Sequence, residues 1–185
     1  MKKVYFTIAL PVLFLLTGCS NEPVEHSQNS DVSEMRSSVA REEVTDGKQY
    51  LENKTAYLRD VNVTILESEV IPMGTYEYQE NAQLVITYEV KNKTNEDINP
   101  LYGYMIAFDA FQEEENALKR LDVGPTPYMN KYDWALETQL DIIKKDGSLK
   151  NIIAYDLRDT ETPVTLIASD DVSGDYLGEI IIHVK

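Results

Sequence analysis

Residues 83–90 read Gln-Leu-Val-Ile-Thr-Tyr-Glu-Val, and Leu84, Ile86, Tyr88 and Val90 occupy alternate positions. A period of two places these four side chains on one face of a β-strand. β-Branched and aromatic residues are favoured in strands because they fit a pleated, half-buried surface. The segment therefore predicts a strand with one face against a hydrophobic core.

The same alternation returns along the rest of the chain. It begins again at Val61, Tyr102, Ile153, Val164 and Ile180. Turn residues separate these segments, among them the acidic run Glu113–Asn116 and the Asp146-Gly147 step, which is typical of tight turns. Several short strands without a long helical pattern predict an all-β fold, an antiparallel β-sandwich.

Two stretches resemble a known family. One is Asn92-Lys93-Thr94-Asn95 followed by residues 104–112, and the other is residues 154–159 followed by Thr162-Pro163-Val164. They are similar to the middle of a lipoprotein family of low-GC Gram-positive bacteria, the domain of unknown function 5067. The resemblance covers residues 50–185 and implies an immunoglobulin-like β-sandwich outside the cell. It supplies no catalytic residues, and the Cys…Trp…Cys pattern of antibody domains is missing.

The N-terminus has the pattern of a lipoprotein signal. A basic start is followed by an apolar run from Val4 to Leu16, which is shorter than the roughly 20 residues of a membrane span and contains Pro11. The order Leu16-Thr17-Gly18-Cys19 then resembles the bacterial lipobox. This resemblance implies cleavage before Cys19 and a diacylglycerol thioether on it. Two acyl chains hold a protein stably on a membrane, so we expect an anchor on the outer face of the cell membrane.

These features predict three parts of the chain: a signal peptide (1–18), an acylated Cys19 with a flexible tether (19–49), and a β-sandwich domain (50–185). The tether is rich in Ser, Glu, Asn and Gln. Such a composition buries too little apolar surface to offset the entropy lost on ordering, so we expect the tether to be disordered.

Composition excludes several classes of function. The formal net charge of −15 leaves no electrostatic footprint for nucleic acid. Cys19 is the only cysteine, so its acylation leaves no thiol for a disulfide, a nucleophile or a metal site. No cofactor is predicted, and the fold must be stabilised by its apolar core.

The segment Gly124–Trp134 is the strongest candidate for a binding site. It contains the only Trp of the chain, Trp134, together with Tyr128 and Tyr132. Loops on a rigid sandwich often carry binding residues, and aromatic rings give a large contact area at a low entropy cost. The alternative is that Tyr128 and Trp134 fold back and close an open end of the core, which is the commoner fate of a lone Trp.

Catalytic and metal sites are weakly indicated. His183, the only histidine of the predicted domain, alternates with Ile182 and Val184 and is expected on the surface, without a nucleophile motif. Asp170, Asp171 and Asp175 are a weak candidate for calcium, although the loop lacks the EF-hand pattern and is more simply a polar turn. We therefore do not expect an enzyme.

Three functions remain open. The first is a membrane-anchored extracellular module that binds a peptide, a glycan or another envelope protein, with the aromatic loop as the site. The second is a structural or accessory lipoprotein that docks to an envelope complex. The third is a hydrolase with paired carboxylates, which would need a cleft and shifted pKa values.

Overall fold

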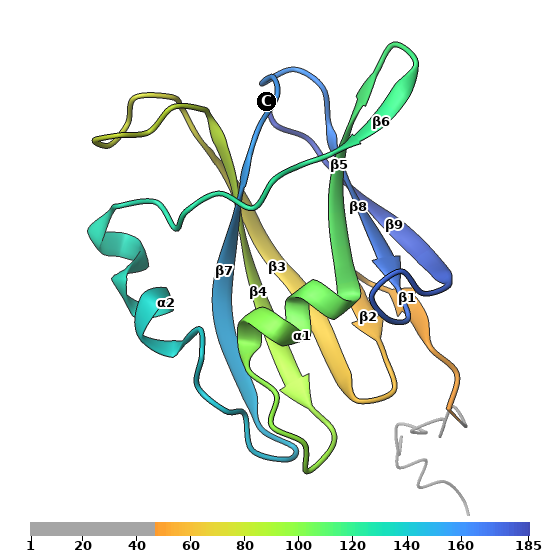
Figure 1. Cartoon of the computed structure of the whole chain (residues 1–185). Helices are drawn as coiled ribbons and strands as arrows, with labels where there is room; N and C mark the ends of the chain where they lie inside the picture. Colours follow the sequence, from red (N-terminus) through yellow and green to blue (C-terminus); the bar gives the residue numbers. More distant parts are fainter. Residues whose placement is uncertain (1–46) are drawn as a thin grey trace, which may run out of the picture. The chain divides into compact units, whose positions relative to one another are not determined.

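The computed structural model describes residues 47–185. The predicted signal, the lipid site at Cys19 and most of the predicted tether lie outside these residues. Two antiparallel sheets lie face to face (Figure 1). The five-stranded sheet has the order β1 (Tyr50–Glu52), β2 (Thr55–Tyr57), β3 (Val61–Ile71), β4 (Gln83–Asn92), β7 (Ser148–Asp156). The four-stranded sheet has the order β6 (Ala117–Arg120), β5 (Phe108–Glu114), β8 (Val164–Ser169), β9 (Tyr176–Ile182).

The inner faces of the two sheets form the main core. The side chains predicted from the alternation in residues 83–90 all point into it, and each is at most 1% exposed. The opposite sheet contributes the alternate residues of β5 and β8, which are Phe108, Ala110, Val164, Leu166 and Ala168. The predicted immunoglobulin-like antiparallel β-sandwich is confirmed.

One predicted strand is wrong. The alternation from Tyr102 to Phe108 lies mostly in a helix, α1 (Pro100–Ala107), which runs directly into β5. Asn99 caps this helix, because its side-chain oxygen accepts a hydrogen bond of 2.8 Å from the backbone N–H of Tyr102. Pro100 stands in the first turn, where its missing N–H costs nothing. The local capping signal therefore outweighs the period of two.

The helix packs tightly against the five-stranded sheet. A Cβ atom added at Gly103 would lie 2.6 Å from Cγ1 of Val90, so only glycine allows this approach. Tyr104, on the same helix, is fully buried and packs against Tyr88 with 4.5 Å between ring centroids. Helix α1 is thus part of the core.

One edge of β3 is paired along only part of its length. Strand β2 pairs with β3 only from Asn62 to Thr64, whereas β4 pairs with β3 as far as Ile71 (Figure 1). A register shift, typical of a β-bulge, lies between Ile65 and Glu67 on β3. In the other sheet β9 is a terminal strand. None of the helices in residues 47–185 is long and apolar enough to cross a membrane.

Candidate functional site

Two loops meet at the end of the sandwich where β3 stops. One joins β3 to β4 (residues 72–82), and the other follows β6 (residues 121–129). The Gln83 side chain connects them, because its Nε2 donates to the carbonyl oxygen of Pro125 at 3.3 Å and to Oδ1 of Asp156 at 2.9 Å. Its Oε1 accepts a hydrogen bond of 2.6 Å from the hydroxyl of Tyr76. The two loops therefore share one polar anchor.

Each of these loops exposes a tyrosine. Tyr78 is 88% exposed and Tyr128 is 84% exposed. Tyr78 also has a positive φ of 66°, which is unusual for a bulky residue. The loop around it is fixed by Gln79, whose side chain accepts from the N–H of Thr75 at 2.8 Å and donates to the carbonyl of Asn81 at 2.9 Å. Both aromatic rings are thus presented to solvent from tied loops.

Tyr132 has a different role from Tyr128. It lies in a short 3-10 helix (Asn130–Tyr132) ahead of α2 (Asp133–Thr138), and it is only 5% exposed. Its ring packs on the outer face of the five-stranded sheet, in a cluster separate from the main core. The other buried members of this second cluster are Ile71, Val85, Ala135, Ile152 and Ala154.

Glu69 ties this segment to β3. Its carboxylate accepts hydrogen bonds from the hydroxyl of Tyr132 and, at 2.6 Å, from Nζ of Lys131. Burial and the hydrogen bond to Glu69 raise the pKa of Tyr132 above its usual value. Burial acts to raise the pKa of Glu69 as well, but the hydrogen bonds from Lys131 and Tyr132 outweigh it and lower that pKa. Tyr132 is therefore an anchor of the candidate loop and does not offer its ring to a ligand.

The Trp134 side chain is partly exposed and is held by a hydrogen bond to the backbone. It is 39% exposed, and its ring N–H donates to the backbone carbonyl of Lys131 at 2.9 Å. The alternative that Tyr128 and Trp134 close an open end of the core does not apply, because both side chains are exposed and neither belongs to the main core. Of the three aromatic candidates, Tyr128 is by far the most exposed.

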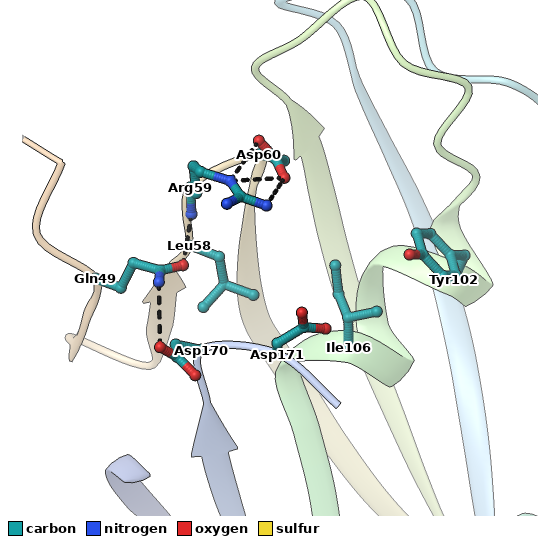
Figure 2. Close-up of a pocket in the computed structure, with 8 residues that line it drawn as sticks. All are labelled: Gln49, Leu58, Arg59, Asp60, Tyr102, Ile106, Asp170 and Asp171. Atoms are coloured by element: carbon teal, nitrogen blue, oxygen red, sulfur yellow. Dashed lines mark hydrogen bonds and ion pairs between the residues drawn. The ribbon is translucent and has the colours of Figure 1, made fainter. Parts of the chain in front are cut away.

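The weak calcium candidate lies beside a small pocket of about 210 Å³ (Figure 2). The guanidinium of Arg59 occupies its rim and donates to the carboxylate of Asp60 at 3.1–3.2 Å. The Gln49 side chain connects the backbone of Arg59 to Asp170. It accepts a hydrogen bond from the backbone N–H of Arg59 at 2.8 Å and donates one to the carboxylate of Asp170 at 3.4 Å. Asp171 lines the same pocket, which helix α1 closes on the other side.

The aspartates of this loop satisfy backbone groups. Asp170 accepts from the N–H of Asp175 at 2.7 Å, and Asp171 accepts from the N–H of Val172 at 2.7 Å. Within residues 47–185, no three His, Cys, Asp or Glu side chains are placed to hold a metal ion. The arrangement is that of a polar turn with a neighbouring cation, Arg59.

Comparison with known proteins places the chain in a family. The profile of the domain of unknown function DUF5067 matches residues 36–170. The chain belongs to this family. The resemblance seen in the sequence is thereby confirmed, and a search of curated proteins finds no match to this DUF5067 chain.

Two solved structures share the DUF5067 fold seen here. A proposed lipoprotein from Staphylococcus aureus has a TM-score of 0.65 at 17% identity, over 74% of this chain and 92% of that one. A protein from Enterococcus faecalis has a TM-score of 0.58 at 14% identity, over 74% of this chain and 94% of that one. At these identities the likeness concerns the fold alone.

A second hollow of this DUF5067 chain, of about 430 Å³, lies near the β5–β6 hairpin and is lined largely by acidic residues. Its lining includes Glu113, Glu114, Asp122, Asp156 and Asp159, together with Arg158. Arg158 donates to Glu114 at 2.6 Å. The N–H groups of Thr162 and Glu161 lower the pKa of Asp159, which is the opposite of what a general acid requires. His183, the histidine considered above, is exposed just beyond β9 and does not line this hollow.

Sequence reasoning missed Tyr78. The residue falls between two predicted strands, where Tyr76 and Tyr78 alone are too few to give a periodic signal. The step Pro72-Met73-Gly74 marks a turn and could have directed attention to the loop that follows it. Its exposure and its proximity to the Tyr128 loop depend on the Gln83 side chain, which no local pattern reveals.

Proposed function

We propose that this DUF5067 protein is a lipid-anchored, non-catalytic binding module of the cell envelope, which recognises its partner through Tyr78 and Tyr128. The observation that carries the proposal is the near-complete exposure of these two rings on tied, adjacent loops. The lipobox pattern at Leu16–Cys19 and the description of the S. aureus neighbour as a lipoprotein support the anchor.

Exposed tyrosines on fixed loops suit recognition. A tyrosine buries a large apolar area on contact and loses little rotamer entropy, and tied loops reduce the cost of ordering on binding. The positive φ of Tyr78 adds to this argument, since backbone strain tends to be kept where a side chain must be aimed. The partner would be a protein or a glycan with a flat surface for the two rings.

The loops lie far from the point where the chain reaches the sandwich. β1 begins at Tyr50, which pairs with Tyr57, and Tyr57 pairs with Asn62 at the start of β3. The Tyr78 loop follows Ile71 at the other end of β3, and Gln83 ties the Tyr128 loop to it. At 3.3 Å per residue, the strand separates the two ends by about 30 Å. With an anchor at Cys19, this leaves the tyrosines on the end opposite the tether attachment.

The proposal is tested by photo-crosslinking on intact cells. p-Benzoylphenylalanine replaces Tyr78 or Tyr128 in the full chain, and Tyr176 serves as the control because it is exposed at the start of β9. We expect the same adduct from positions 78 and 128 and a different pattern, or none, from 176. Identical adducts at all three positions, or none at 78 and 128, would contradict the proposal.

The identity of the adduct separates the two remaining roles. A glycan or a secreted polypeptide supports a binding module. One stoichiometric subunit of a membrane complex supports instead the accessory lipoprotein that the sequence left open. In either case Tyr128→Ala should remove the adduct formed at position 78, provided that the far-ultraviolet circular dichroism is unchanged.

A further inference from the structure

The free edge of β3 (Leu66–Val70) ends beside the Tyr78 loop, which begins after Ile71, but its unpaired backbone groups have no role in the function proposed above. From Glu67 to Val70, β3 pairs with β4 on one side, and Leu66 is the extra residue at the bulge. No described strand pairs with the other side of Leu66–Val70. The unpaired stretch is about 17 Å long at 3.3 Å per residue. Unpaired N–H and C=O groups along a strand edge are a template for an added strand.

A groove lies beside the first part of this edge, at Leu66–Ser68. It has a volume of about 190 Å³ and lies between the bulged part of β3 and the terminal strand β9. Its lining residues are Lys54, Ile65, Leu66, Glu67, Ser68, Ile180, Ile181, Ile182 and His183. Ile181 is about half exposed, so the groove offers apolar surface as well as backbone groups. An extended peptide could use both.

Strand β2 fixes the direction of such a peptide. β2 is antiparallel to β3, and Thr55, its first residue, pairs with Thr64. A peptide that continues the line of β2 along Leu66–Val70 would therefore end, at its C-terminus, next to Lys54. Lys54 is already held at this point, because its carbonyl oxygen accepts a hydrogen bond of 2.9 Å from the N–H of Ile65.

The charges along the groove match a C-terminal peptide. No salt bridge within residues 47–185 involves Lys54, so its ammonium is available for a terminal carboxylate. Glu67 is exposed on β3 and also lacks a salt bridge there, whereas Glu69 is paired with Lys131. Glu67 thus favours a basic side chain on the incoming strand, since opposite charges across a strand pair are stabilising.

We propose that the free edge of β3 binds the C-terminal segment of a partner polypeptide as an added antiparallel strand, with its terminal carboxylate at Lys54. A second copy of this chain fits the edge less well. Antiparallel self-pairing over residues 66–70 would place Glu67 of one chain opposite Glu69 of the other, in two chains that each carry a formal net charge of −15. Pairing of two copies through this edge is therefore disfavoured, and binding of a basic, extended C-terminal segment is favoured.

The test uses the full-length protein in detergent micelles and a synthetic peptide of three Lys-Val repeats with fluorescein on its N-terminus. The peptide is made with a free C-terminal carboxylate and, as a matched control, with an amide. Fluorescence anisotropy gives the affinity of each form, and amide hydrogen exchange locates the bound strand. We expect protection of Leu66–Val70 and about tenfold tighter binding of the acid, as for one charge-assisted hydrogen bond.

Substitution of the cation completes the test. Lys54→Gln should remove the preference for the free acid, whereas Lys145→Gln, the same change at an exposed turn, should leave it intact. If the wild-type protein binds the free-acid and amide forms of the peptide equally well, the proposal is overturned, whatever the variants show. Protection outside residues 66–70, or sedimentation showing a dimer in which the same amides are already protected, would also overturn it.

Discussion

The hydroxyl of Tyr132 donates a hydrogen bond to the carboxylate of Glu69, across a sequence separation of 63 residues. This contact fixes the segment that carries the candidate loop onto the outer face of the five-stranded sheet. Tyr132→Phe keeps the ring in place and removes only the hydroxyl. Because Glu69 retains Lys131, we expect a loss of about 1 kcal/mol in the free energy of unfolding, measured by urea denaturation. Tyr128→Phe, at an exposed site, should change nothing.

The same carboxylate predicts an acid-dependent effect. The pKa of Glu69 is lowered in the folded state, so its contribution to stability is complete above its pKa in the unfolded chain, near 4.5. That contribution is lost as the pH falls through the lower, folded pKa. Glu69→Gln should therefore flatten part of the decline in urea midpoint below pH 4.5. An unchanged acid limb would show that Glu69 is not stabilised in this way.

Tyr88 carries a buried hydroxyl that lacks a hydrogen-bond partner among residues 47–185. Its side chain is 0% exposed, and the burial of an unpaired hydroxyl is unfavourable. Tyr88→Phe should therefore raise the free energy of unfolding by about 1 kcal/mol. Tyr155→Phe is the matched control, because the Tyr155 hydroxyl donates to that of Tyr104 at 3.4 Å, and its removal should bring no gain. A destabilised Tyr88→Phe variant would indicate a bound water at this hydroxyl.

These buried tyrosines also predict sensitivity to alkali. Burial raises the pKa values of Tyr88, Tyr104 and Tyr155 above that of a free tyrosine, which is about 10. Below pH 10 the tyrosines are protonated in both states and stability is unaffected. Above it the unfolded chain releases protons that the folded chain retains, so stability falls. The urea midpoint should decline steeply between pH 10 and 11.5, and tyrosinate absorbance should rise together with unfolding.

Gly103 allows helix α1 to approach Val90 on β4. Gly103→Ala would place a methyl group 2.6 Å from Cγ1 of Val90 and should cost about 1–3 kcal/mol through overpacking. Val90→Ala removes the clashing atom, so the double variant should be more stable than the sum of the single changes predicts. Strict additivity in thermal unfolding would show that the two residues do not touch.

The strands were predictable where large apolar side chains alternate on the core face, as they do at Leu84, Ile86, Tyr88 and Val90, although β4 and β7 also bury consecutive residues. Helix α1 was not recognised because the same residues carry two patterns. Tyr102, Tyr104 and Ile106 alternate as in a strand, while the side chains that are actually buried, at Pro100, Tyr104 and Ala107, follow helical spacing. Asn99-Pro100 was the decisive local signal.

The candidate site was predictable only in part. The segment Gly124–Trp134 was singled out from its aromatic content, and the structure then separates an exposed Tyr128 from a buried Tyr132. Which tyrosine is buried depends on Glu69 and Ile71 of β3, and sequence spacing gives no measure of such a long-range contact. The participation of Tyr78 depends in the same way on Gln83.

The apolar cluster that contains Tyr132 is distinct from the one between the sheets, whereas Ile143 belongs to the main core. We therefore expect the segment from Pro125 to Leu140 to open as a cooperative unit of its own. It should detach at a lower free-energy cost than global unfolding and leave the sandwich intact. A protease that samples this opening would nick the chain there first. The two fragments would remain associated through the paired strands, and the Tyr128 loop would be released while the Tyr78 loop stays in place.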